Sequence, residues 1–337
     1  AALAAGLQIA QQHCQAKKPE VVIPAYCCPD LLSAILYNDM KPVLVDFIPD
    51  KPYMDLNGIE EALNENTVAV IAVNFLGIPE RFREIKQLLQ DMPTLLIEDS
   101  CQWFPESDEA FASHEGDLVV YSFGKGKPVC LLGGGALSVV DAAYQNYAPT
   151  GDITPDYKKT SIAKAMLNRV KYLAYNLVLT PYAYWLLEFL PFIKLGETRF
   201  HPLTSITAMA SDKLIFLNHN IETYQRRYKN NFATWQSINI SIGAENVSAL
   251  QDNCATYSTQ YLLRLPVLFN TDNSRNVFLD SPKSGQIGAS PLYLKILPLI
   301  EKVPSQLQAD KNFPNGEDFA NRLLTLPTYS KPQRMET

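Results

Sequence analysis

The sequence predicts an α/β protein in which a mainly parallel sheet lies between helices, followed by a smaller C-terminal α+β unit. The chain has 337 residues, enough for about two domains. Hydrophobic residues make up 47% and charged residues 19%, a composition that excludes global disorder. Over residues 1–140, helical patterns alternate with short strands that are apolar throughout. This alternation is typical of a parallel sheet covered on both faces.

Each element of this first region has its own signal. Short apolar runs predict strands at residues 20–24, 42–47, 68–73, 94–97, 118–122 and 136–140, and helical patterns cover residues 1–16, 30–38, 56–63 and 80–90. Open parallel sheets bind their ligands at the carboxyl ends of the strands. The residues that follow the strands are therefore the first candidates for a site: Pro24, Ala25, Tyr26, Asn74, Asp99 and Ser122.

The remaining chain changes character. Residues 141–195 are rich in Tyr, Leu and Pro and predict an apolar helical insert, residues 202–233 predict one long helix, and residues 261–269 and 316–324 predict a strand and a helix. We expect a large domain over residues 1–195, and a linker helix with a small C-terminal domain over residues 196–337. The first helical pattern starts at Ala1 without a capping residue, so we expect further residues upstream.

One segment raises the question of a membrane. Residues 172–187 carry no charge, but Asn176 and Pro181 interrupt the run, and a spanning helix needs about 20 apolar residues. We expect the apolar pair over residues 172–193 to be covered by protein, either the chain's own core or a partner subunit. Peripheral contact with a membrane interface is the alternative.

Charge and cysteine usage exclude several classes of protein. The formal net charge is −6, and a mildly acidic chain is a poor partner for nucleic acid, because phosphate neutralisation supplies most of that affinity. The six cysteines contain no C-x-x-C pair, and the four histidines are scattered, so we expect no metal site. A reducing cytoplasm is the expected location.

Three features could carry chemistry. Asp99 follows an apolar strand and would point into the ligand crevice, or else cap a helix. Ser122 opens the sequence SFGKGKP, whose glycines and hydroxyl could bind a phosphate and whose lysines could neutralise it or form a Schiff base; a solvated loop is the alternative. Residues 133–135 are three glycines before a strand, which allow a close backbone approach or a bulge.

The order of these motifs is more specific than any one of them. It runs Asp99-x-x-Gln102, Gly116-Asp117, Ser122-Phe123-x-x-x-Lys127 and then Gly-Gly-Gly-Ala. This order resembles the DegT/DnrJ/EryC1/StrS family of sugar aminotransferases, which are fold-type-I pyridoxal-phosphate enzymes. The upstream sequences VIPAY, PVLVD and AVIAVNFLG are similar to segments of the same family. The resemblance is good over residues 1–140 and weaker beyond.

The resemblance implies pyridoxal 5'-phosphate as cofactor and assigns it four residues. Lys127 stands at the family's Schiff-base lysine, and Ser122 at the serine that binds the cofactor phosphate. Asp99 stands where a carboxylate pairs with the pyridinium nitrogen, and Gln102 stands near the ring's phenolic oxygen. Elementary chemistry agrees, since a buried carboxylate keeps the ring nitrogen protonated and a freed lysine can act as a general base.

The sequence also departs from the family. Cys101 matches the small residue on one ring face, but Cys28 stands where the family has an aromatic residue over the other face. Phe200 or a neighbour replaces the asparagine that reaches the partner's phosphate. The family's Gly-Thr phosphate turn would precede Ala1. Lys125 is a second lysine in the loop, and spacing favours Lys127.

The resemblance implies that the chain is an enzyme, a PLP-dependent aminotransferase acting on a keto sugar. The substrate is expected to be nucleotide-linked and glutamate to be the amino donor. A PLP-dependent sugar dehydratase or an aminotransferase of another small ketone is the first alternative, and Lys127 argues against those family dehydratases that carry histidine there. A non-catalytic scaffold or partner-binding protein of the same fold is the second. The family also implies a homodimer with shared active sites.

Overall fold

A computed structural model describes residues 1–105, 107–147, 166–167, 169–171, 198–227, 247–249, 262–304, 307 and 312–327. The expected insert over residues 141–195, its apolar pair at residues 172–193 and the expected domain boundary lie almost entirely outside these ranges. No helix within them is long and apolar enough to span a membrane.

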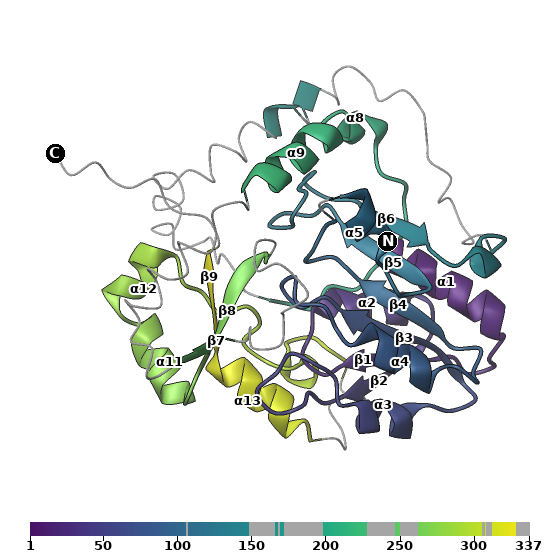
Figure 1. The fold of residues 1–337 in the computed structure, drawn as a ribbon, viewed down its shortest axis with the longest axis horizontal. Helices are drawn as coiled ribbons and strands as arrows, with labels where there is room; N and C mark the ends of the chain where they lie inside the picture. Colours follow the sequence, from purple (N-terminus) through teal and green to yellow (C-terminus); the bar gives the residue numbers. More distant parts are fainter. Residues whose placement is uncertain are drawn as a thin grey trace.

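A six-stranded sheet forms the centre of the N-terminal part (Figure 1). Its strand order is β2-β1-β3-β4-β5-β6; β5 and β6 pair antiparallel, and all other pairs are parallel. The mainly parallel sheet expected from the sequence is therefore confirmed. The strands are β1 (Glu20–Pro24), β2 (Lys41–Val45), β3 (Thr67–Val73), β4 (Leu95–Asp99), β5 (Leu118–Ser122) and β6 (Gly135–Val139).

Helices cover both faces of this sheet, because alternate residues of each strand point to opposite sides. Ile71 and Ile97 share one hydrophobic core with the first two helices, whereas Val70 and Leu96 share another with the next two. The helices are α1 (Ala2–Cys14), α2 (Pro29–Tyr37), α3 (Leu56–Ala62), α4 (Phe82–Leu88) and the short α5 (Asp108–Ala112), and a 3₁₀ turn covers Ala142–Tyr144.

The C-terminal part contains a three-stranded antiparallel sheet with helices beside it (Figure 1). One side of this sheet forms a small core of its own, and Phe319 and Leu323 from this part join the large core of the N-terminal part. The elements are α8 (Ser211–Leu214), α9 (Leu217–Arg227), β7 (Val247–Ala249), β8 (Arg264–Phe269), α11 (Asp272–Leu279), α12 (Pro282–Ile287), α13 (Pro314–Arg322) and β9 (Leu323–Pro327), with a 3₁₀ turn at Leu297–Leu299.

The prediction of one long helix over residues 202–233 is wrong for its first residues. Residues 201–210 are not helical, and helix begins only at Ser211. Pro202 fixes its own φ and disfavours helical geometry in the residue before it. Leu203 and Ile206 instead pack against the large core, so burial of apolar side chains along a non-helical segment replaces the helix that their spacing suggests.

Candidate active site

The carboxyl ends of β3, β4 and β5 bring the first candidate residues together. Asp99 ends β4 and is buried, with 4% of its surface exposed. Its backbone carbonyl accepts a hydrogen bond from the backbone N–H of Asn74 at 3.0 Å. The backbone N–H of the next residue, Ser100, donates to the Val120 carbonyl at 2.9 Å. These bonds fix the backbone at Asp99 to the strands on either side.

Asp99 does not cap a helix. Its Oδ1 accepts the Cys101 amide at 2.9 Å, and the chain then forms a turn in which Trp103 donates to the Ser100 carbonyl at 3.2 Å. The capping alternative is therefore wrong, because no helix follows the strand here.

Lys127 lies in the loop that connects β5 and β6, half-buried, whereas Lys125 is exposed. Burial lowers the pKa of Lys127, but the Cys101 and Cys28 thiols and the Asp99 and Asp30 carboxylates raise it more, and the net pKa is above its ordinary value. Lys127 therefore lies within electrostatic range of Asp99 and both cysteines. Within the described ranges, no hydrogen bond or ion pair engages the Lys127 amine.

The two thiols next to Lys127 are neutral at physiological pH. Burial raises the pKa of Cys28 to about 11, and burial likewise raises that of Cys101 well above its ordinary value. Because reactivity belongs to the thiolate, neither cysteine is a nucleophile under these conditions.

Ser122 lies in the tight turn that leads to Lys127. Its Oγ accepts the Gly124 amide at 3.3 Å, and the Lys127 amide donates to the Gly124 carbonyl at 3.3 Å. A Cβ on Gly124 would lie 3.4 Å from the Ser122 Oγ and 3.7 Å from the Lys127 Cγ. Serine hydroxyl, glycine backbone and lysine side chain therefore meet in one turn, the kind of donor set that binds phosphate.

Gln102 is buried and held at both ends of its amide. Its Oε1 accepts the Leu76 amide at 2.6 Å, and its Nε2 donates to the Tyr293 hydroxyl at 2.9 Å. Tyr293 comes from the C-terminal part, 191 residues further along the chain. Sequence reasoning missed it, because no motif surrounds this tyrosine and only tertiary packing brings it here.

Other candidate residues from the sequence lie in the hydrophobic core or in a second polar cluster. Tyr26 is buried among Phe47, Phe75 and Phe319. Phe200 is a buried residue of the large core. The side-chain Nδ2 of Asn74 donates to the Glu98 Oε1 at 3.0 Å and to the Ser100 Oγ at 2.7 Å.

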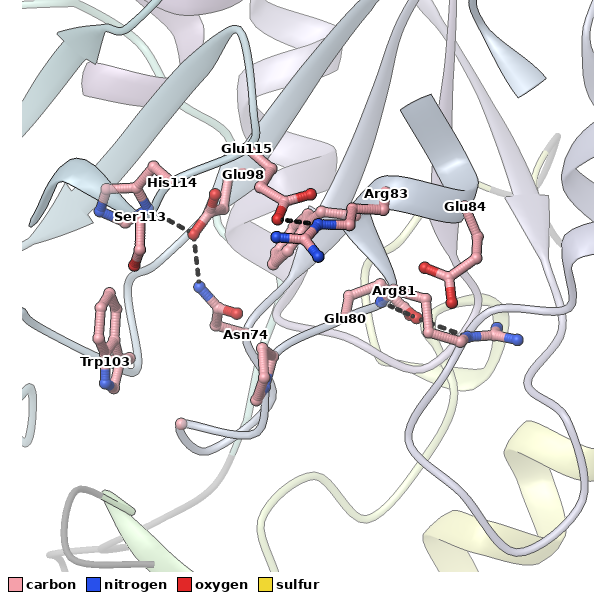
Figure 2. A pocket seen from close by; sticks show the side chains of 13 residues that line it. Asn74, Glu80, Arg81, Arg83, Glu84, Glu98, Trp103, Ser113, His114 and Glu115 are labelled. Atoms are coloured by element: carbon pink, nitrogen blue, oxygen red, sulfur yellow. Dashed lines mark hydrogen bonds and ion pairs between the residues drawn. The ribbon is translucent and has the colours of Figure 1, made fainter. Parts of the chain in front are cut away.

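Glu98 and Asn74 belong to a second polar cluster around a separate cavity (Figure 2). Glu98 accepts from the His114 ring at 2.7 Å, and the other His114 nitrogen lies 2.5 Å from the Tyr121 hydroxyl. Burial raises the pKa of Glu98, but the bonds from His114, Asn74 and Ser100 outweigh it and lower the pKa overall. The cavity has about 220 Å³, and Lys127 and Asp99 do not line it.

A half-buried lysine and a buried carboxylate and amide thus lie at the carboxyl edge of a helix-covered, mainly parallel sheet. Residues 1–150 match the model of the DegT/DnrJ/EryC1/StrS aminotransferase family. The matched residues hold the strands β1 to β6.

Curated relatives match a part of the chain. It is 31% identical over 122 residues to the UDP-N-acetyl-3-dehydro-alpha-D-glucosamine 3-aminotransferase of Acidithiobacillus ferrooxidans. The aligned region covers 36% of this chain and 33% of that protein. It is 27% identical over 86 residues to the GDP-4-keto-6-deoxy-D-mannose 3-dehydratase of Escherichia coli O55:H7, which covers 26% and 22%. The chain thus matches a third or less of the length of these relatives.

A solved structure extends the similarity in fold. NtdA of Bacillus subtilis, solved with bound cofactor PMP, superposes with a TM-score of 0.65 at 15% identity and covers 98% of this chain and 68% of that one. At this identity the comparison shows the fold, and the arrangement of β1 to β6 with the C-terminal part is therefore that of the fold-type-I enzymes.

Proposed function

We propose that the protein is a pyridoxal-phosphate-dependent aminotransferase acting on a keto sugar, with a nucleotide-linked sugar as substrate and glutamate as amino donor. The observation that carries the proposal is that Lys127 lies within electrostatic range of Asp99 at the carboxyl edge of the sheet. Gln102 lies in the turn after Asp99, and Ser122 lies in the turn before Lys127. The match of residues 1–150 to the family model and the similarity to a curated sugar aminotransferase support it.

The polar groups that are left unused in this cluster suit the cofactor. The Lys127 amine has no hydrogen-bond or ion-pair partner among the described residues, and the Asp99 carboxylate is buried. Gln102 has one amide hydrogen beyond the bond to Tyr293. The amine can bind the cofactor's aldehyde, the carboxylate its ring nitrogen, and the amide donor its phenolic oxygen.

Each side chain then has a defined task. Lys127 would hold the aldehyde carbon of pyridoxal phosphate, which would supply an electron sink when bound. Asp99 would hold the proton at the ring nitrogen, and Gln102 would donate to the phenolic oxygen. Ser122 and the backbone of its turn would bind the phosphate. Lys127, once free, would move the proton at the reacting carbon.

The reaction balances as two half-reactions. The amino group of glutamate replaces the ketone oxygen of the sugar, and glutamate leaves as 2-oxoglutarate. Cys101 and Cys28 would lie at the two ring faces, and a small thiol in the place of an aromatic residue provides less stacking area.

We further propose that the active form is a homodimer whose partner subunit completes each site, and that the protein acts in the cytoplasm.

The test supplies the protein with pyridoxal phosphate, glutamate labelled with heavy nitrogen and nucleotide-linked keto sugars. Mass spectrometry of the sugar should show one labelled amine, together with release of 2-oxoglutarate, and Lys127→Ala should abolish both. A sugar that loses water and gains no nitrogen would instead indicate a dehydratase. A protein that neither binds the cofactor nor changes any sugar would indicate the scaffold alternative.

A further inference from the structure

A tyrosine from the C-terminal part reaches the candidate active site. Tyr293 lies between α12 and the 3₁₀ turn at Leu297–Leu299, and 8% of its surface is exposed. Its hydroxyl accepts the Gln102 Nε2 at 2.9 Å, while the Gln102 Oε1 is held by the Leu76 amide. The orientation of the Gln102 side chain therefore depends on Leu76 from the N-terminal part and on Tyr293 from the C-terminal part.

Tyr293 is itself fixed by the loop that follows β1. The Tyr26 hydroxyl donates to the Tyr293 carbonyl at 2.9 Å and accepts the Tyr293 amide at 3.3 Å. The two rings pack edge to face with centroids 5.6 Å apart, and the Leu297 amide donates to the Ala25 carbonyl at 2.8 Å. These bonds place the Tyr293 phenol relative to the segment that carries Cys28.

The Tyr293 hydroxyl keeps its proton at physiological pH. Burial raises its pKa far above the ordinary value, and the nearby Cys28, Cys27, Tyr26 and Asp99 side chains act in the same direction. A protonated phenol oxygen can accept the Gln102 hydrogen without becoming a charged partner. Of the two Gln102 amide hydrogens, one is thus taken by Tyr293 and the other remains for a ligand.

We propose that Tyr293 is a positioning residue for cofactor binding, which holds the Gln102 amide in the orientation that leaves its second hydrogen for the phenolic oxygen of the cofactor. This inference rests on the proposed function. It also makes cofactor affinity depend on docking of the C-terminal segment against Tyr26, because that docking places the phenol.

The alternative is that the Tyr293 hydroxyl only anchors the C-terminal segment. A double-mutant cycle separates the two roles. The apoprotein is titrated with pyridoxal phosphate, and the dissociation constant is measured by absorbance for the wild type, Tyr293→Phe, Gln102→Ala and the double variant. Thermal unfolding of each apoprotein is followed in parallel to show that each variant is folded.

We expect Tyr293→Phe to weaken cofactor binding about threefold to tenfold, the range for loss of one neutral hydrogen bond. In the Gln102→Ala background the same change should have no further effect, because the residue through which Tyr293 acts is gone. Tyr121→Phe is the matched control: it also removes a buried tyrosine hydroxyl, the one beside His114, and should leave the dissociation constant unchanged.

Two results would overturn the inference while leaving the proposed function intact. One is equal weakening by Tyr293→Phe in both backgrounds; the other is a lower unfolding temperature with unchanged cofactor affinity. A wild-type protein that binds no cofactor would overturn both the inference on Tyr293 and the proposed function. If Tyr293→Phe does not fold, Tyr26→Phe takes its place, because it loosens Tyr293 without touching its hydroxyl, and the same dependence on Gln102 is expected.

Discussion

At the scale of single residues, the charge of Asp99 is the feature on which the proposed chemistry depends most. Asp99→Asn keeps the size of the side chain and can still accept the Cys101 amide, so we expect the variant to fold and to bind pyridoxal phosphate. It cannot hold a proton on a ring nitrogen as a carboxylate does. We expect the turnover rate to fall by about two to four orders of magnitude, measured by steady-state kinetics. Near wild-type turnover would mean that Asp99 serves only the turn after β4.

Glu98, next to Asp99 in sequence, points to the opposite face and contributes to stability instead. Its pKa is lowered in the folded protein, so its contribution is fully present above the unfolded pKa of about 4.5 and is lost as pH falls through the folded value. Glu98→Gln should reduce the free energy of unfolding at pH 7 by about 1–3 kcal/mol, and the deficit should shrink below about pH 4.5. Denaturant melts at several pH values measure this.

Glu115→Gln is the control for this prediction. Its partner Arg83 has 81% of its side chain exposed, and such surface pairs contribute about 1 kcal/mol or less. A deficit for Glu98→Gln that stays constant down to pH 3 would show that hydrogen bonding alone, and not the charge on Glu98, stabilises the cluster with His114.

At the scale of elements, the pairing of β5 with β6 depends on glycine. A Cβ on Gly135 would lie 2.5 Å from the Tyr121 carbonyl oxygen, a backbone atom that cannot swing aside. We expect Gly135→Ala to lower the free energy of unfolding by about 1–3 kcal/mol, measured by denaturant melts. Gly285→Ala in α12 is the matched control, because no atom lies within 4 Å of the added Cβ, and should be neutral or stabilising by up to about 1 kcal/mol. Equal effects would contradict this account of the strand pair.

The elements also show how far sequence reasoning reaches. The runs LVVYS and EVVIP are apolar, short and bounded by turns, and both strands lie where the sequence predicts. Helix α11 was not predicted, although Thr271 and Ser274 form a capping box there, because its sequence has no clear apolar stripe. Asp99, Gln102 and Lys127 could be proposed from one stretch of chain, whereas Tyr293 could not, since its place depends on packing of the C-terminal segment against Tyr26.

At the scale of the whole molecule, Asp46 connects the two parts of the chain. Its carboxylate accepts the Gly316 amide at 2.7 Å and the Asn315 amide at 3.0 Å, so a residue just after β2 satisfies the first turn of α13. Together with the Tyr26–Tyr293 contact, this bond places the C-terminal part against the strand ends, where the candidate site lies.

The proposed assembly is tested at the same scale. We expect a symmetric homodimer with an interface of the obligate class, above about 2,000 Å². Light scattering coupled to size exclusion should give twice the chain mass over a wide range of protein concentration. A stable monomer with bound cofactor would contradict the shared active site.

The central claim is that Lys127 carries the cofactor, and covalent trapping tests it most directly. The protein is incubated with pyridoxal phosphate, reduced with borohydride and digested, and the modified peptide is identified by mass spectrometry. Our account predicts one modified lysine, Lys127, with no modification in Lys127→Ala and full modification in Lys125→Ala. A label on Lys125, or on no residue of the β5–β6 loop, would contradict it.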